Sequence, residues 1–396
     1  LWPLSTRRPR LPVDVASVGF LRAIGDDALL GTAQALAGRD CRGSQVTTAA
    51  QLRLGGLWLL ARAHRDRGRT VRLSCAMLAL LPSFLLPAFT ASYEADEYAS
   101  APVSESYAER RDQYLATHAE TTGGGAFSAL ARMELDHRPD PAAFDGDLEQ
   151  MDQRRDCADF RLHPILRLLY AYSDLGLVSD DLLARARASV LGFKYWPDEP
   201  GKDHMCTWSE NHHILFSAGG YLAGQLYPTE TFANSGETGA AKMARFRPRV
   251  IRWLDLRYMT GFSEWLSNVY HDEDISGLVS LIDFAEDEEI VAKASMVLDL
   301  MLLDVAVNQF RGTFGSTHGR SYLGSKRDGG SEATRSLTRL VFGMNSFATG
   351  NQAGVSLALS KRYRAPAVLE AIAQDVDRAE MEHRGRSGIR LEEAER

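Results

Sequence analysis

Apolar residues recur at helical spacing from about residue 150 onward. Intervals of three and four residues place them on one face of an α-helix. The pattern predicts helices over 159–176, 179–193, 214–228, 246–259, 273–285 and 287–310, with a further helical stretch over 331–359. The alternation of apolar and polar residues that is typical of strands does not occur between residues 150 and 310. The sequence therefore predicts an all-α protein.

The segments between residues 151 and 360 have the pattern of long helices joined by short loops. The segment 214–228 is apolar on nearly all sides, so we expect it to be deeply buried. Helices of this kind pack as stacked hairpins, and we expect the hairpins to close into an incomplete (α/α) toroid. An open α-solenoid or a plain helical bundle is the alternative. No fixed repeat is visible, which disfavours the TPR, HEAT and armadillo solenoids.

Residues 1–70 differ in composition from the rest, with 11 Arg, no Lys and few acidic residues. Their apolar patches are short, so they offer little surface from which to build a core. Two interpretations remain open for this segment. It is either a poorly ordered basic arm or a stretch that is foreign to the native protein.

Residues 71–91 resemble a signal peptide, because a short positive flank precedes a mostly apolar run and then small residues. The run is short for a membrane span, and Pro82 and Pro87 disfavour a stable spanning helix. We therefore expect a secreted or periplasmic protein without stable membrane insertion. A buried core helix is the alternative for this run.

Two polar regions flank the predicted helical domain. Residues 92–150 are polar and contain the glycine run 123–125, which predicts a linker followed by the first helices. Residues 361–396 form a charged tail that we expect to be truncated.

Charge and motif content exclude several classes of function. The formal net charge is -7 and the pI is about 5.9, whereas a dedicated nucleic-acid-binding protein is usually basic, so we expect no nucleic-acid partner. None of the 4 Cys lies in a C-x-x-C pair, and G-x-G-x-x-G, Walker and H-E-x-x-H motifs are absent, so we expect no cofactor and no metal. The alternative is a metal site built from His204, Cys206, His212 and His271, whose spacing fits no standard zinc pattern.

Polar and aromatic residues that helix packing does not require concentrate in three segments, the first being 194–213. Ser209 is suited to cap a helix, which places Glu210, Asn211 and His212 in its first turn. Backbone N–H groups there lack intrahelical partners, so the turn can bind an anionic group of a substrate. An ordinary helix cap is the alternative. The predicted substrate-binding residues of this segment are Trp208, Glu210 and His213.

The second segment, residues 261–274, carries polar side chains where a core helix would carry apolar ones. If it is mainly helical, one stripe holds Glu264, Asn268 and His271, and the neighbouring stripe holds Ser263, Ser267, Tyr270 and Asp274. Trp265 flanks both stripes. Asn, Ser, Tyr and His beside an aromatic ring are more typical of a cleft than of a solvated face.

The third segment, residues 314–322, combines glycines with His318, Arg320 and Tyr322. A glycine-rich loop lets the backbone approach a ligand closely. The Arg guanidinium can donate two parallel hydrogen bonds to a carboxylate or sulfate. A turn whose Arg pairs with a helix end is the alternative.

With these residues, the chain resembles the polysaccharide lyases built on an incomplete (α/α) toroid, which act on alginate, chondroitin and hyaluronate. The resemblance covers about residues 160–325 and is carried by Asn211-His212, by Tyr270 and by His318-Gly319-Arg320. It implies that Asn211 and Arg320 neutralise the uronate carboxylate, that His212 removes the C5 proton and that Tyr270 protonates the leaving oxygen. Glu264 would orient one of these catalytic groups. The expected partner is therefore a polysaccharide or oligosaccharide, although the β-sandwich that usually follows the toroid is absent.

Two alternatives to the lyase remain open. Helical toroids also host glycoside hydrolases, which need two carboxylates flanking the bond. Glu210 with Glu264, or Glu264 with Asp272 or Asp274, could supply them. The other alternative is a helical glycan-binding protein that uses its aromatic side chains and needs no catalytic residue.

Overall fold

The computed structural model describes residues 100–121, 124–348, 353–378 and 380–384. The expectations for residues 1–70 and for the signal-like segment 71–91 lie outside these residues. The described part of the chain is mostly helical, which confirms the predicted all-α class. None of its helices combines the length and apolar character that a membrane crossing requires.

The first half of the described chain forms short and medium-length helices. They are α4 (Tyr107–Ala119), α5 (Gly125–Glu134), the 3₁₀-helix η4 (Pro141–Phe144), α6 (Asp145–Asp152), α7 (Ala158–Ala171) and α8 (Asp180–Gly192). Capping side chains help these partly polar segments to form helices. Ser106 and Glu109 form a reciprocal capping box at the start of α4, and Ser179 caps α8 through its side chain.

The second half contains the longest helices and one small hairpin. Its elements are α9 (Glu210–Leu226), α10 (Gly239–Thr260), α11 (Asn268–Phe284), α12 (Glu288–Asn308), β1 (Gln309–Phe310), β2 (Thr313–Phe314), α13 (Leu323–Arg327), η5 (Gly329–Ser331), α14 (Arg335–Phe342), α15 (Ala353–Leu359) and α16 (Ala367–Gln374). β1 and β2 pair antiparallel, with Gln309 opposite Phe314. The stretch predicted to be helical over 331–359 contains two helices, α14 and α15, and α14 ends at Phe342 because Gly343 adopts the left-handed conformation.

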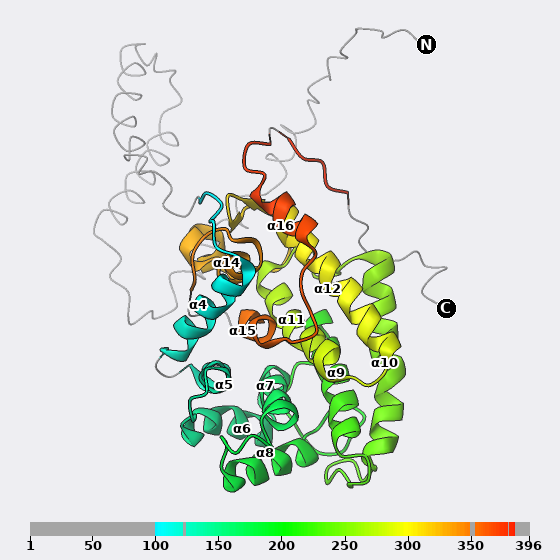
Figure 1. The fold of residues 1–396 in the computed structure, drawn as a ribbon. Coiled ribbons are helices and arrows are strands. Elements are labelled where there is room, and N and C mark those ends of the chain that lie inside the picture. Colours follow the sequence, from blue (N-terminus) through cyan, green and yellow to red (C-terminus); the bar gives the residue numbers. More distant parts are fainter. Residues whose placement is uncertain (1–99, 122–123, 349–352, 379, 385–396) are drawn as a thin grey trace, which may run out of the picture. The chain divides into compact units, whose positions relative to one another are not determined.

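Helix α9 lies at the centre of the core, as its apolar sequence predicts. It packs against α10 along most of its length and also contacts α7 and α11 (Figure 1). A Cβ atom at Gly224 would lie 2.5 Å from the backbone oxygen of Gly239, so only a residue without a side chain allows this close crossing of α9 and α10. Farther along the chain, α15 packs on α11 and α16 packs on α12.

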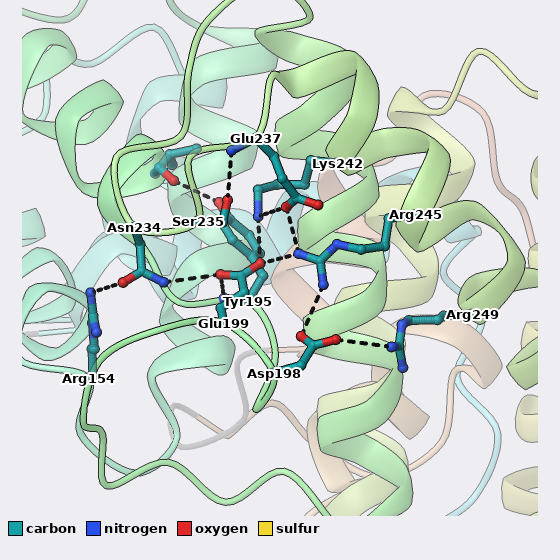
Figure 2. Close-up of polar contacts among 11 residues, drawn as sticks. Arg154, Tyr195, Asp198, Glu199, Asn234, Ser235, Glu237, Lys242, Arg245 and Arg249 are labelled. Atoms are coloured by element: carbon teal, nitrogen blue, oxygen red, sulfur yellow. Dashed lines mark hydrogen bonds and ion pairs between the residues drawn. The ribbon is translucent and has the colours of Figure 1, made fainter.

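A buried network of charges fixes the loop that leads into α9 (Figure 2). The ammonium group of Lys242 on α10 is fully buried and lies 2.6 Å from the Glu199 carboxylate of that loop. Arg245 also pairs with Glu199 and reaches Glu237 at 2.8 Å. Lys242 further lies 4.7 Å from the centre of the Tyr195 ring, a cation–π distance. These contacts anchor residues 193–209 on α10, and the start of α9 is thereby held in place.

Candidate active site

The carboxylate of Glu210 joins three segments at the start of α9. It is buried, it pairs with the Arg257 guanidinium of α10, and it accepts a hydrogen bond from the Ser263 backbone N–H at 2.6 Å. The Trp253 indole N–H donates to the Glu210 backbone oxygen at 3.0 Å. Glu210 therefore ties α9 to α10 and to the loop after α10, and its negative charge is neutralised by Arg257.

Asn211 follows in the same turn and is fully buried. Its backbone N–H donates to the Glu264 carboxylate at 3.2 Å, and its side-chain oxygen accepts from the Ser209 hydroxyl at 2.5 Å. The side-chain nitrogen Nδ2 of Asn211 is buried without a hydrogen-bond partner in the described structure. A carboxylate thus occupies the anion site expected at this helix start, and the buried amide nitrogen beside it has no hydrogen-bond partner among the described residues.

His212 forms a buried pair with an acid that the sequence did not single out. Its Nδ1 lies 2.6 Å from Oδ2 of Asp159, in the first turn of α7. The imidazole stacks on Phe160 with ring centres 5.1 Å apart. Burial raises the pKa of Asp159, and the contact with His212 opposes this rise. With Nδ1 held by the carboxylate, Nε2 is the ring nitrogen left for chemistry.

His213 points in a different direction. Its ring lies 5.5 Å from that of Trp196, and a hydrogen bond with the Thr207 backbone holds it on that side. Burial lowers the pKa of His213. Of the two neighbouring histidines, His212 is therefore the one that meets a carboxylate.

The helical stripe predicted for residues 261–274 is wrong. Residues 261–267 form a loop, and α11 begins only at Asn268. Gly261 and Leu266 have φ values of 69° and 44°, which interrupt the helical path. Glu264 therefore shares no helix face with Asn268 and His271, and it reaches Asn211 from the loop.

Asn268 and His271 lie inside the fold and line no open surface. The Asn268 amide donates to the Glu332 carboxylate at 2.6 Å and accepts from the Ser321 hydroxyl at 3.2 Å. His271 is 1% exposed and lies 5.1 Å from the Phe262 ring, and burial lowers its pKa to about 4. The structure thus gives Asn268 a role in holding the third segment and places His271 in the core.

The third segment docks on the second through its backbone. Gly319 N–H donates to the Trp265 backbone oxygen at 2.8 Å, and the Ser267 hydroxyl donates to the Arg320 backbone oxygen at 2.6 Å. His318 packs 5.8 Å from the Phe314 ring, and its Nδ1 is buried without a hydrogen-bond partner in the described structure. This docking brings the Arg320 side chain to the start of α11.

Arg320, Tyr270 and Tyr322 form one cluster. The Arg320 guanidinium lies 4.5 Å from the centre of the Tyr270 ring, and its Nη2 donates to the Tyr322 hydroxyl at 3.1 Å. The two tyrosine hydroxyls are 2.5 Å apart. Burial raises the pKa of Tyr270, the hydrogen bond with Tyr322 adds to the rise, and Arg320 opposes it.

Glu264 is the point at which the three segments converge. Burial raises the pKa of its carboxyl group, and the Asn211 N–H, Arg320 and His212 each oppose this rise. The charge of Glu264 in turn raises the pKa of Tyr270. Two tryptophans border this region, with Trp208 80% exposed and Trp265 38% exposed. The structure therefore brings Asn211, His212, Glu264, Tyr270 and Arg320 into one electrostatic neighbourhood.

Glu273 is a further acid of the site that sequence reasoning missed. Burial raises its pKa to about 7, with Asp159 adding to the rise and Arg161 and His212 opposing it. It belongs to the run Asp272-Glu273-Asp274, three acids inside an apolar helix. That run is the sequence signal that could have drawn attention to it, because buried acids in an apolar helix are costly unless they have a use.

The structure contradicts the set of residues that the sequence offered for a metal site. Among the described residues, the potential metal-binding group consists of Asp156, Cys157 and His212. His204, Cys206 and His271 are not part of it, and only His212 is common to both sets.

No family model, no curated protein and no solved structure matches the chain.

Proposed function

We propose that this protein cleaves an acidic, uronate-containing polysaccharide by β-elimination at the site around the start of α9. The observation that carries the proposal is the pairing of two features on one helical turn. Asn211 has a buried amide nitrogen without a partner, and the adjacent His212 is paired with a buried carboxylate. An amide donor beside an oriented imidazole is what proton abstraction next to a carboxylate requires.

Neutralisation of the substrate carboxylate is the first requirement of the reaction. The C5 proton of a uronate is weakly acidic until that charge is compensated, because the electron pair left behind delocalises onto the carboxylate. Asn211 Nδ2 and the Arg320 guanidinium are the donors for this role. Glu264 supports it by accepting from the Asn211 backbone N–H at 3.2 Å, which fixes the turn that carries the amide.

His212 is the general base of the proposed reaction. It takes the C5 proton on Nε2, while Asp159 holds Nδ1 and stabilises the imidazolium that forms. The electrons of the broken C–H bond form the double bond between C4 and C5, and the bond from C4 to the glycosidic oxygen breaks. The products are an unsaturated uronate and a shortened chain.

Tyr270 supplies the proton to the leaving oxygen. Its phenol is protonated at neutral pH, as a general acid must be, because the ordinary pKa of tyrosine is about 10 and burial raises the pKa of Tyr270 further. Tyr322 lies within hydrogen-bond distance of Tyr270 and also accepts from Arg320, so it can pass a proton back to Tyr270 after turnover. The exposed ring of Trp208 offers a flat apolar surface on which a sugar can stack.

A glycoside hydrolase is the second candidate, favoured by the raised pKa of Glu264. Burial and the charges of Glu210 and Glu264 also raise the pKa of Asp274, so Glu264 and Asp274 form an interacting carboxyl pair. Glu210 is unsuited as a partner, because its carboxylate is bound by Arg257 and Ser263. In the hydrolase Glu264 would be the general acid, whereas in the lyase it positions Asn211.

The first experiment incubates the purified protein with a panel of uronate polysaccharides and follows ultraviolet absorbance. An increase reports the conjugated double bond of an unsaturated uronate and supports elimination, and Asn211→Ala and Tyr270→Phe should abolish it. New reducing ends without that absorbance would overturn the lyase in favour of the hydrolase. Binding of the glycan without any product would leave the non-catalytic glycan-binding protein as the function.

A further inference from the structure

We infer that Asp156, Cys157 and His212 form a binding site for a divalent transition-metal ion of zinc type. The inference concerns metal binding and does not rest on the function proposed above. It uses the loop between α6 and α7, which carries Asp156 and Cys157, and the first turn of α9, which carries His212.

The three side chains are close enough to share one ion. A carboxylate oxygen of Asp156, the Cys157 sulfur and a ring nitrogen of His212 all lie within 4.8 Å of one another. A zinc ion lies about 2.0–2.3 Å from each of its ligand atoms, so binding requires side-chain rotations that draw these three atoms together. Cys157 is the cap residue at the start of α7 and has a φ of 63°, an uncommon backbone conformation for a residue other than glycine.

The chemistry of the ligands selects the class of ion. Thiolate and imidazole favour Zn²⁺ and related transition metals, whereas Mg²⁺ and Ca²⁺ favour oxygen ligands alone. Three protein ligands leave one position of a tetrahedral zinc open to water or to a substrate atom. Asp156, Cys157 and His212 would therefore form a site that leaves one coordination position of the ion free.

Surrounding contacts hold the ligands as in known metal sites. A histidine that binds a metal through one ring nitrogen commonly donates the N–H of its other ring nitrogen to a carboxylate. Here Asp159 takes Nδ1 of His212 at 2.6 Å, which leaves Nε2 for the ion. The Asp156 carboxylate is held in turn by the Cys206 backbone N–H at 3.1 Å.

A buried oxygen and the local charge give independent support. Oδ1 of Asp159 is fully buried without a hydrogen-bond partner in the described structure, so one oxygen of this carboxyl group next to His212 is left unsatisfied by the protein. Asp156, Asp159 and Glu273 all act electrostatically on Cys157, and Arg161 is the cation that opposes them. A divalent ion would compensate this excess and stabilise the thiolate.

A consequence for turnover follows if His212 is also the catalytic base. An ion on Nε2 removes the lone pair that would accept the substrate proton. Zinc is then an inhibitor of elimination, and a chelator restores the activity. This consequence alone depends on the proposed function.

The test titrates the full-length protein with Co²⁺, which reports thiolate ligation by a charge-transfer absorption in the near ultraviolet. We expect this absorption, its removal by added Zn²⁺, and its loss in Cys157→Ala. The matched control is Cys206→Ala, because Cys206 is the other free cysteine of the described residues and lies outside the group.

A second variant guards against a folding defect. Asp156 is exposed, so Asp156→Asn should leave the circular dichroism of the protein unchanged. It should weaken Co²⁺ binding by about tenfold or more, the range seen when groups of a metal site are removed. A wild-type protein without the absorption, or one that keeps it in Cys157→Ala, overturns the inference. Co²⁺ affinity that is unaffected by Asp156→Asn removes that residue from the site and contradicts the inference as stated.

Discussion

The Nδ1 atom of His212 lies 2.6 Å from Oδ2 of Asp159, and both side chains are buried. The contact joins the first turn of α9 to the first turn of α7. An ionised Asp159 accepts the Nδ1 proton and so fixes the tautomer in which Nε2 carries a lone pair. Asp159, which lies 53 positions earlier in the chain, thereby orients the His212 imidazole.

Replacing Asp159 by Asn should lower kcat on the uronate polymer by about 100-fold or more, because the wrong tautomer of His212 is then stabilised. KM should change little, since Asp159 is fully buried and does not face the substrate. Steady-state kinetics on the wild type and the variant measure both constants. Asp180→Asn is the matched control, an exposed acid in the first turn of α8. Equal kcat values for Asp159→Asn and wild type would remove His212 from the role of general base.

Replacing Tyr270 by Phe should lower kcat by about 100-fold or more on a natural polysaccharide, because the leaving oxygen loses its proton donor. The loss should shrink on a uronate that carries an aryl ether on its C4 oxygen, because the phenolate that then leaves from C4 needs no protonation. Tyr322→Phe should cost less, since Tyr322 acts through Tyr270. Tyr258→Phe is the surface control, at 59% exposure. An equal loss on both substrates would argue that Tyr270 has a structural role and is not the acid.

Glu264→Gln separates the two candidate reactions. In the lyase the Gln side-chain oxygen can still accept from the Asn211 N–H, so we expect kcat to fall by no more than about tenfold, the range of one hydrogen bond. In the hydrolase the general acid is lost, and activity should fall by a factor of about 100 or more. Product analysis of the same reaction, by ultraviolet absorbance and by reducing ends, shows which comparison applies.

The sequence predicted the local part of this site and missed the contacts between distant segments. Ser209 before an apolar run predicted the start of a helix. In the structure α9 begins at Glu210, the next residue, with Ser209 at the cap position. His212 stood out by its residue type, but its partner Asp159 resembles any acid in the first turn of a helix. Only tertiary packing decides that this acid is buried.

Glu264 shows the limit of arguments from helical spacing. Its grouping with Asn268 and His271 assumed that residues 261–274 are mainly helical, whereas the backbone turns at Gly261 and Leu266 and α11 begins at Asn268. Glu264 reaches the site from a loop, and His271 turns into the core. A helical stripe is therefore informative only where the backbone is helical, and residues 261–267 are not.

Lys242→Met should destabilise the protein by about 1–3 kcal/mol, because the buried Glu199 carboxylate loses its ammonium partner and keeps Arg245 alone as a cationic partner. Lys242 is fully buried, and its chain atoms lie among aromatic rings that Met can also contact. Lys293→Met is the matched control on α12. Lys293 pairs with Asp255 at a more exposed position, so this change should cost at most about 1 kcal/mol. Urea unfolding of the three proteins measures the difference. Similar losses in both variants would contradict a structural role for the buried network of Figure 2.

His271 should make the fold sensitive to acid. Burial lowers its pKa from 6.5 to about 4, so the unfolded chain binds a proton between these pH values while the native state does not. Its contribution to stability is therefore present above pH 6.5 and is lost as the pH falls toward 4. The full difference corresponds to about 3 kcal/mol for this group.

His271→Leu removes that proton-linked term while keeping an apolar side chain beside Phe262. The free energy of unfolding, measured by urea at pH values above and below this window, should fall less on acidification in the variant than in the wild type. Part of the acid sensitivity should remain, because burial also lowers the pKa of His118 and of His163 to about 4. His137→Leu, at an exposed position, should behave like the wild type. An unchanged pH dependence in His271→Leu would mean that His271 can take up a proton without unfolding, and it would then have to face water and not the core.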